Sequence, residues 1–419
     1  MLKFVHAADI HLDSPFVGLA EAAPDVQKLL CEATFKAFDN VIGLCLEEHV
    51  DFLLLAGDIY DAKDRSLRAQ LRFSDGLKRL DEAGIRTFVV HGNHDPLDGW
   101  KANLKWPDRV HVFGAERVES VVYERDGEAQ AIIHGVSFGK AEVRDNLAAR
   151  FSRQDSPLFQ VGLLHCNVGA ASGHENYSPC TRQDLELSGL DYWALGHVHN
   201  RQILNERGPY VAYSGNTQGR HINESGPRGC FLVSVDDSGG VEARFVPTDV
   251  VRWQSADFSI EGIADIDGLI DEISRCLSDL HNASDGRPTI CRLTITGRGP
   301  MHSELCNSSR QDEYLEEIRR IGASLAPAVF IADVRLSTGP DLDIDVRMKS
   351  QDIVGDCLRL VREHQTDGER LRELGGCLDE LFNHRDVRRY LERFDDQAVI
   401  EMLQSAQSLL LDELLGAQE

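Results

Sequence analysis

Short apolar runs alternate with amphipathic stretches from Met1 to about Pro247. The runs are typical of strands and the stretches between them of helices. In chain order the runs are LKFVHA, DFLLLAG, RTFVVHG, AIIHG, VGLLH, YWALGH, YVAYSG and GCFLVSV. Most of them end in a polar cluster with Asp, His, Asn or Gly. Ligands of open sheets bind at the carboxyl ends of the strands, so the pattern predicts a layered α/β domain with one site fed by many loops.

The pattern changes after this first region. We expect a helix over about 265–281, a strand over 289–297, a helix over about 311–324 and a strand over 329–337. Residues 351–419 have the pattern of helices throughout, with Gly368 and the pair Gly375–Gly376 as breaks. The sequence therefore predicts three domains: a catalytic domain over 1–247, a small α/β domain over 248–347 and a helical region over 348–419. The apolar positions of that last region either pack on the body or form a docking surface for a partner.

Composition narrows the class of protein. The chain has 419 residues, of which 42% are apolar, and 44 basic against 69 acidic residues give a net charge of −25. This charge argues against broad, non-specific adhesion to nucleic acid or anionic lipid. No apolar run approaches the roughly 18 residues of a membrane span. The opening MLKFVHAADIHLDS has the pattern of a strand rather than of a secretory leader. We therefore expect a cytoplasmic protein that is not integral to a membrane.

Cysteine and histidine are distributed differently along the chain. The ten cysteines form no CxxC pair, which indicates reduced thiols and neither a zinc finger nor a disulfide framework. Eleven of the sixteen histidines lie within the first 199 residues, mostly beside Asp, Gly or Asn. This clustering indicates that the chemistry belongs to the N-terminal half.

Five short polar clusters follow the predicted strands. They are Asp9-Ile10-His11, Gly57-Asp58-Ile59-Tyr60-Asp61, Gly92-Asn93-His94-Asp95, His165 after VGLL, and Gly196-His197-Val198-His199. Each alone is typical of a turn aspartate or a strand-end histidine, because such short patterns arise often by chance. Their joint occurrence favours a single chemical site.

The residue types in these clusters fit two divalent metal ions. Two metals about 3.5–4 Å apart need a bridging carboxylate, further oxygen or imidazole ligands, and open positions for water and a phosphate oxygen. Alternate residues of an extended segment point the same way, so we expect Asp9 with His11, and His197 with His199, to face one cavity.

Glycine precedes three of the cluster residues, Asp58, Asn93 and His197, and is expected to allow tight turns there. The mixture of Asp, Asn and His with no thiolate favours manganese, iron or zinc over magnesium alone and excludes an iron–sulfur centre. We therefore expect two divalent ions as cofactors, with manganese as the leading candidate.

In identity, order and spacing, the five clusters resemble the calcineurin-like metallophosphoesterase superfamily over roughly residues 1–235. Two further stretches, HAADIHLDSPFVGL and YSGNTQGRHINESGPRGC, are similar to the bacterial YhaO branch of the SbcD-type DNA-repair exonucleases. The resemblance implies a four-layer αββα sandwich followed by a small α/β cap domain. It also implies C-terminal helices that bind an SMC-like ATPase, and dimerisation through the catalytic domain.

Carried over residue by residue, the resemblance also implies two ligand sets. One metal would be held by Asp9, His11, Asp58 and His199, and the other by Asp58, Asn93, His165 and His197. His94 would be a non-ligand histidine that stabilises the transition state or protonates the leaving oxygen, with Asp95 orienting its ring. Water activated by two cations would be the nucleophile, so no serine or cysteine nucleophile is needed.

One position departs from part of the family. Archaeal and eukaryal repair nucleases have histidine at the end of the GDxxx motif, where this chain has Asp61, as bacterial members commonly do. Asp61 is therefore a candidate substrate contact in place of that histidine. Arg220 and His221 follow the GHxH strand closely enough to reach the metal rim. For both, phosphate contact and a structural loop role stay open.

Other polar residues are expected to be structural. His6, His91 and His134 lie in or beside apolar runs, which is typical of buried, hydrogen-bonded histidines. Cys166 follows His165, and strand alternation turns it to the opposite face.

The negative charge is the main objection to a DNA substrate, because duplex affinity comes largely from Lys and Arg on phosphates. The arginines of the catalytic domain would have to form a local patch, unless metals and partner subunits supply the attraction. Among those arginines are Arg117, Arg125, Arg144, Arg150, Arg153, Arg201, Arg220 and Arg228.

The sequence favours a metal-dependent DNA nuclease, an exonuclease that could also act as an endonuclease, with a two-metal mechanism in DNA repair. One alternative is a phosphodiesterase of the same superfamily that cleaves a small phosphoester or a cyclic nucleotide. The other is a non-catalytic scaffold that binds DNA ends or an ATPase. The cap and the tail argue against the first alternative, and the complete ligand set argues against the second.

Overall fold

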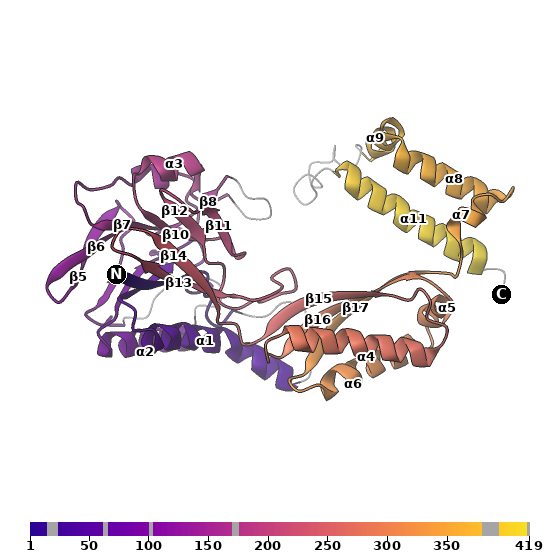
Figure 1. Ribbon diagram of the computed structural model, residues 1–419, viewed down its shortest axis with the longest axis horizontal. Coiled ribbons are helices and arrows are strands. Elements are labelled where there is room, and N and C mark those ends of the chain that lie inside the picture. The colour runs from indigo at the N-terminus through magenta and orange to yellow at the C-terminus, as the bar shows by residue number, and fades with distance from the viewer. Residues whose placement is uncertain (15–23, 62–65, 100–103, 170–175, 379–393, 417–419) are drawn as a thin grey trace. The chain divides into compact units, whose positions relative to one another are not determined.

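The computed structural model describes residues 1–14, 24–61, 66–99, 104–169, 176–378 and 394–416 (Figure 1). The chain folds into two compact units. One comprises Met1–Gln254 with Ser284–Cys291, and the other comprises Ser255–Ala283 with Arg292–Glu419. Parts of the predicted helical region, residues 379–393 and 417–419, lie outside the described residues.

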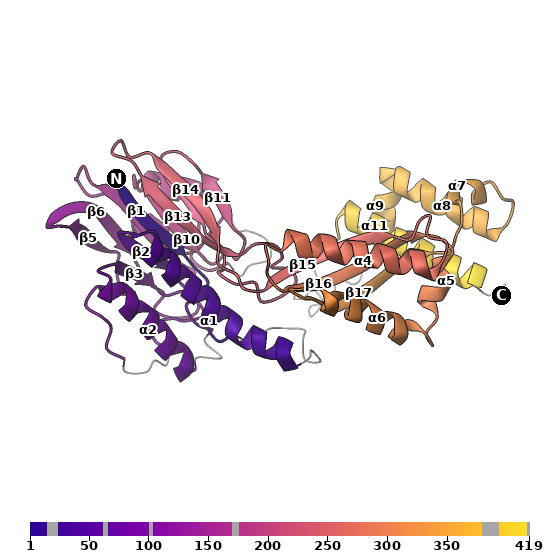
Figure 2. The same ribbon diagram turned by 60° about the horizontal axis from the view of Figure 1, so that its bottom comes forward.

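Two six-stranded sheets form the centre of the first unit (Figures 1 and 2). The first sheet has the order β14 (Val241–Pro247), β13 (Gly229–Val235), β1 (Leu2–Ala7), β2 (Phe52–Ala56), β3 (Arg86–Val90), β4 (Val110–Val112). In it β1 to β4 run parallel, while β13 and β14 are antiparallel additions.

The second sheet has the order β11 (Gln202–Asn205), β12 (Tyr210–Tyr213), β10 (Tyr192–Gly196), β7 (Phe159–His165), β6 (Glu128–Gly135), β5 (Glu119–Arg125). Its four central strands are parallel and its two edge strands are antiparallel. A short parallel pair, β8 (Asn167–Val168) and β9 (Pro179–Cys180), follows β7.

Alternating side chains of the strands build three apolar layers. Phe4, Phe52 and Leu54 face Val161 and Leu163 in the space between the two sheets, where all five are buried. The other face of the first sheet packs on α1 (Pro24–Glu47) and α2 (Leu67–Glu82). The outer face of the second sheet packs on α3 (Arg182–Leu187) and the short 3₁₀ helix Ala148–Arg150. The predicted four-layer αββα sandwich is confirmed.

The second unit contains a three-stranded sheet in the order β15 (Arg252–Ser259), β16 (Thr289–Arg298), β17 (Val329–Gly339). Helices α4 (Ile266–Ala283) and α6 (Gln311–Ser324) pack side by side against this sheet (Figure 1). The two helices and two strands predicted here are confirmed within three residues at each end. Two elements of this unit were not predicted from the sequence. They are β15, which is half exposed, and the short helix α5 (Met301–Cys306).

Four further helices complete the described part of the second unit: α7 (Ile344–Arg347), α8 (Ile353–Thr366), α9 (Gly368–Cys377) and α11 (Asp396–Gly416). Val354, Leu358 and Leu411 form their buried core. Gly368 begins α9, as expected of a break, because the Asp367 side chain caps the helix there. The expected break at Gly375–Gly376 is wrong, since both glycines belong to the last turn of α9.

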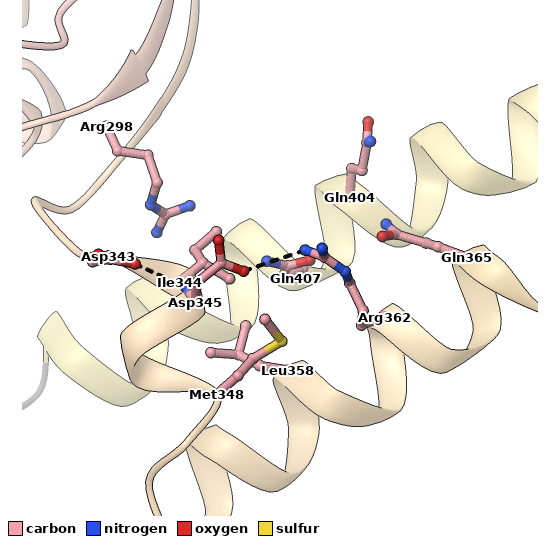
Figure 3. A pocket seen from close by; sticks show the side chains of 10 residues that line it. All are labelled: Arg298, Asp343, Ile344, Asp345, Met348, Leu358, Arg362, Gln365, Gln404 and Gln407. Atoms are coloured by element: carbon pink, nitrogen blue, oxygen red, sulfur yellow. Dashed lines mark hydrogen bonds and ion pairs between the residues drawn. The ribbon is translucent and has the colours of Figure 1, made fainter.

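A pocket of about 370 Å³ lies where α7, α8 and α11 approach the end of β16 (Figure 3). Arg362 forms an ion pair with Asp345 across it at 3.5 Å. The Asp343 carboxylate accepts hydrogen bonds from the first backbone amides of α7, which it caps. Gln365, Gln404 and Gln407 line the rest of the pocket. The carboxylates of Asp343 and Asp345 are thus engaged in capping α7 and in pairing with Arg362. We therefore interpret the pocket as a consequence of helix packing.

Among the described residues, no helix is both long and apolar enough to cross a membrane.

Candidate metal centre

The five polar clusters all follow parallel strands that end at the same edges of the two sheets. Asp9 follows β1, Asp58 follows β2 and Asn93 follows β3 in the first sheet. His165 ends β7, and His197 follows β10 in the second sheet. β7 and β10 are paired neighbours in register, which puts His165 beside Gly196. The packing of one sheet on the other therefore brings the clusters together.

The backbone turns sharply at these strand ends. Four non-glycine residues of the clusters have positive φ angles: Asp9 at 49°, His11 at 45°, Asp58 at 51° and His197 at 103°. The prediction that strand alternation aims these side chains is therefore wrong, because the backbone there is not extended. Left-handed backbone at non-glycine residues costs about 1–3 kcal/mol each and is held only by surrounding structure, typically at functional sites.

Asp9, His11 and His199 form a first group in which one ligand atom of each residue lies within 4.8 Å of the others. The Nε2 atoms of His11 and His199 face each other at 3.2 Å. The Asp9 carboxylate is buried and accepts a hydrogen bond from the His197 backbone amide. Burial raises the pKa of Asp9 to about 6 against the opposing positive charges of His165 and His199.

Asp9, Asp58 and His165 form a second group of the same size. His165 Nε2 lies 3.4 Å from Asp58 Oδ2 and 3.0 Å from Asn93 Oδ1, while His165 Nδ1 contacts the Ala56 carbonyl at 2.9 Å. Burial alone would raise the pKa of Asp58, but the charge and the hydrogen bond of His165 outweigh it and hold that pKa well below its usual range. The negative charge of Asp58 likewise raises the pKa of His165 to about 9 against the effect of burial.

These residues fit divalent metal ions. The Nε2 atoms of His11 and His199 face each other at 3.2 Å. If both are unprotonated, their lone pairs point into the same small space, and a cation bound there would accept both. Asp58 Oδ2 lies 3.9 Å from His11 Nε2 and 3.4 Å from His165 Nε2, so one carboxylate reaches both groups. The set is oxygen and imidazole without thiolate, as Mn²⁺, Fe²⁺ or Zn²⁺ accept. His197 is stacked edge-on to His165, with ring centroids 5.2 Å apart.

Two glycines make room for this convergence. A Cβ on Gly196 would stand 1.9 Å from the Ala56 carbonyl oxygen, and a Cβ on Gly92 would stand 2.3 Å from Asp58 Oδ1. Of the three glycines at which tight turns were expected, Gly57 alone has a positive φ, at 91°. Gly196 is required because the Ala56 backbone approaches it closely, and Gly92 because the Asp58 and His165 side chains occupy the space that a Cβ would need.

His94 contacts a different aspartate from the one expected. Its Nδ1 lies 3.2 Å from Asp61 Oδ1. Asp95 instead accepts hydrogen bonds from the backbone amides of Ile59 and Gly92, and it also contacts the His91 ring. The prediction that Asp95 orients His94 is therefore wrong, because the Asp95 carboxylate binds the backbone of the turns after β2 and β3 and the His91 ring instead.

The protonation of His94 follows from this contact. Burial lowers the pKa of His94, but the hydrogen bond of Asp61 and the negative charge of Asp58 outweigh it, so that pKa is raised above its ordinary value. The same hydrogen bond lowers the pKa of Asp61. Asp61 also accepts a hydrogen bond from Ser14 Oγ and lies 3.8 Å from the Arg220 guanidinium.

Arg220 reaches the site from the loop after β12. Its Nη1 donates to Ser14 Oγ at 2.9 Å, and its charge acts on His11. His221 does not approach in the same way, since its Nδ1 accepts a hydrogen bond from the nearby Asn223 amide at 2.9 Å.

The same loop carries a residue that the sequence analysis missed. Glu224 is buried, and its Oε1 accepts a hydrogen bond from His199 Nδ1 at 2.6 Å. Burial would raise the pKa of Glu224, but the hydrogen bond and charge of His199 outweigh it and lower that pKa to about 2. The sequence signal was an acidic residue four positions after Arg220 in a loop rich in Gly and Asn.

Residues expected to be structural have structural contacts. His6 is fully buried, with its ring between the Tyr192 hydroxyl at 3.0 Å and the Leu195 carbonyl at 3.1 Å. Burial lowers the pKa of His6 to about 3 against the effect of that carbonyl. His134 bridges Ser120 and Gln160. Cys166 packs in the apolar layer outside the second sheet, with its Sγ 3.8 Å from Cys180 Sγ.

The arginines of the first unit are largely engaged with acidic side chains. Of the eight arginines named in the sequence analysis, five lie within 4 Å of a carboxylate: Arg125, Arg144, Arg150, Arg153 and Arg220. Arg228 is buried, and Arg201 stacks over the Phe245 ring at 4.2 Å. These contacts leave much of their charge neutralised by neighbours.

A buried Asp and His cluster at the strand ends of an αββα sandwich defines a calcineurin-like metallophosphoesterase, and the family model for calcineurin-like phosphoesterase matches residues 2–201. A second family model, for the middle domain of metallophosphoesterase YhaO, matches residues 253–339. The chain is 34% identical over 413 residues to the metallophosphoesterase YhaO of Bacillus subtilis (strain 168), covering 99% of this chain and 98% of that protein. It belongs to the YhaO family of metallophosphoesterases.

More distant relatives carry the name DNA double-strand break repair protein Mre11. The protein of Thermoplasma acidophilum is 26% identical over 319 residues, covering 74% of this chain and 80% of that protein. The protein of Haloferax volcanii is 24% identical over 390 residues, covering 85% and 83% of the two chains. The chain is thus similar to repair proteins over most of its length.

Proposed function

We propose that this protein is a metal-dependent DNA nuclease that hydrolyses phosphodiester bonds in DNA repair, as an exonuclease. The observation that carries the proposal is the convergence of Asp9, His11, Asp58, His165 and His199 in a member of the metallophosphoesterase family. The similarity to proteins named for double-strand break repair supports DNA as the substrate.

The proposed ligand sets extend the two groups by Asn93, which contacts His165, and by His197, whose ring meets that of His165 edge-on. Asp9, His11, Asp58 and His199 would hold one divalent ion, and Asp58, Asn93, His165 and His197 the other, with manganese preferred. The reach of Asp58 to both His11 and His165 supports its role as the bridge. Two bound cations would supply an activated water at neutral pH and would neutralise the scissile phosphate, so the chain needs no nucleophile of its own.

His94 has the proposed role of general acid. Its raised pKa favours the protonated ring, and the protonated ring can donate to the leaving oxygen or to the developing charge. Asp61 holds the ring through Nδ1, which leaves Nε2 as the atom that meets substrate. Arg220, at the rim, would contact a phosphate oxygen, with His221 as a further candidate contact.

We also propose roles for the remainder of the chain. Residues 248–347 would form a cap over DNA, and residues 348–419 would dock an SMC-like ATPase. Leu360 and Leu409 support docking, because they stay 55% and 67% exposed on α8 and α11. Co-purification of the ATPase with the full chain, and its loss on changing both leucines to Asp, would test this role.

The test of the catalytic proposal is digestion of an end-labelled linear duplex with Mn²⁺, beside a chelator control. His94→Ala should lower kcat by about 100- to 10,000-fold, because it removes a positioned proton donor. His111→Ala is the matched control, since His111 contacts Glu119 and is only partly buried. Cleavage of an aryl phosphodiester without cleavage of DNA would favour a small-molecule phosphodiesterase instead. DNA cleavage that survives in His94→Ala would refute the role of this histidine.

A further inference from the structure

The Glu224 carboxylate has a complete set of partners around the candidate metal centre. Oε1 accepts from His199 Nδ1 at 2.6 Å, while Oε2 accepts from the Arg220 backbone amide at 2.7 Å and from Asn216 Nδ2 at 2.9 Å. The residue is 8% exposed. An ionised carboxylate can only accept hydrogen bonds. Each of the three nitrogen groups around Glu224 must therefore be the donor in its contact.

This matching fixes the chemistry of His199. Because Nδ1 must donate to Glu224, the ring proton stays on Nδ1 and the lone pair stays on Nε2. Nε2 is the atom that faces His11 Nε2 at 3.2 Å. The tautomer and the aim of the ring are thus set from the side opposite to the metal position.

The loop that carries Glu224 is itself held to the His199 backbone. Arg228 Nη1 donates to the His199 carbonyl at 2.6 Å, and Arg228 Nε donates to the Glu224 carbonyl at 3.1 Å. Trp253 Nε1 donates to the Gly219 carbonyl at 3.0 Å. One loop therefore binds both the ring and the backbone of His199. These contacts hold the Glu224 carboxylate beside the ring.

We propose that Glu224 is a positioning residue that holds His199 in its metal-binding tautomer and orientation and, through the same carboxylate, sets Arg220 at the rim. The inference rests on the metal site of the proposed function. Outer partners of this kind typically change metal affinity 10- to 100-fold when they are removed.

The test is Glu224→Gln in the full chain, with Glu206→Gln as the matched control at an exposed glutamate of the same unit. The Gln side chain has a single oxygen, so its amide group must face either His199 Nδ1 or the Arg220 amide and lose one contact. Calorimetric titration of Mn²⁺ into chelator-treated protein should give two sites in the native chain. We expect one of them to weaken 10- to 100-fold in Glu224→Gln and neither to change in Glu206→Gln.

Nitrogen NMR of the metal-free native chain at pH 8 supplies a second readout, in which His199 should carry its proton on Nδ1. A proton on Nε2 would overturn the inference without any variant, and so would unchanged affinity at both sites in Glu224→Gln. If Glu224→Gln does not fold, Glu224→Asp is measured instead. The aspartate side chain keeps the negative charge but is too short to reach His199 Nδ1. Native Mn²⁺ affinity in Glu224→Asp would therefore overturn the positioning role. A native chain that binds no metal would refute the proposed site itself, which is a separate outcome.

Discussion

Asp61 stands between a histidine and an arginine, and this position decides the charge of the proposed general acid. It contacts the His94 ring at 3.2 Å and lies 3.8 Å from the Arg220 guanidinium. A histidine at this position would offer no negative charge to His94. The aspartate of this chain therefore acts through the protonation of its neighbour.

The pH dependence of kcat tests this contact. Activity that requires protonated His94 falls as the pH rises through the pKa of His94, and Asp61 raises that pKa. Asp61→Asn should therefore move the alkaline limb of the kcat profile to lower pH. Ser14→Ala, which removes a neutral hydrogen bond to Asp61, should leave the limb almost in place. An alkaline limb that stays fixed in Asp61→Asn would mean that His94 is not the titrating acid.

At the scale of the element, the short strands position the site because they are buried on both faces. β2 illustrates this, since all five of its residues are buried. Phe52 stacks on Phe4 with ring centroids 5.0 Å apart and meets Phe88 and Tyr123 edge-on. The proposed ligand Asp58 lies two residues beyond this anchored strand, so packing between the sheets fixes its position.

Phe52→Ala should lower the free energy of unfolding of the first unit by about 3–5 kcal/mol, because it leaves a cavity between the sheets. Urea unfolding followed by tryptophan fluorescence measures this, since all four tryptophans belong to residues 1–254. Val122→Ala, at a residue 40% exposed on β5, should cost less than about 1 kcal/mol. Equal losses in the two variants would contradict the anchoring role of Phe52.

At the scale of the whole molecule, the pattern of the sequence was sufficient to predict a layered α/β domain with one site fed by many loops, and the resemblance of the five clusters to the metallophosphoesterases implied the four-layer sandwich. Apolar runs identify buried strands, and parallel strands deliver their carboxyl ends to one edge. The sequence did not predict contacts that depend on how a turn bends. Asp95 follows His94 directly yet accepts hydrogen bonds from the backbone amides of Gly92 and Ile59, and Glu224 meets His199 only because the chain returns to it after β11 and β12. Both contacts depend on the path of the chain in the tertiary structure, and such a path leaves no local pattern in the sequence.

The net charge of −25 and the paired arginines predict weak attraction to DNA by the chain alone. Each released counterion contributes a slope of about −0.9 to log affinity against log salt. We expect a slope smaller in magnitude than about 3 for duplex binding by His94→Ala with divalent ions present, measured by fluorescence anisotropy. A chelator should abolish most of this binding. A slope of about 6 or steeper would reveal a basic surface that the ion pairs do not neutralise.

The left-handed residues after β1 do not interrupt its pairing with the segment after β2. The backbone amides of Asp9, His11 and Leu12 donate to the carbonyls of Gly57, Asp58 and Ile59 at 3.1, 3.0 and 2.9 Å. These amides are buried between strands at the middle of the first sheet, so they can exchange with solvent only when the sheet itself opens. Left-handed backbone at the candidate site is thus held by hydrogen bonds between central strands, and we expect the amides of Asp9, His11 and Leu12 to be among the slowly exchanging amides of the first unit.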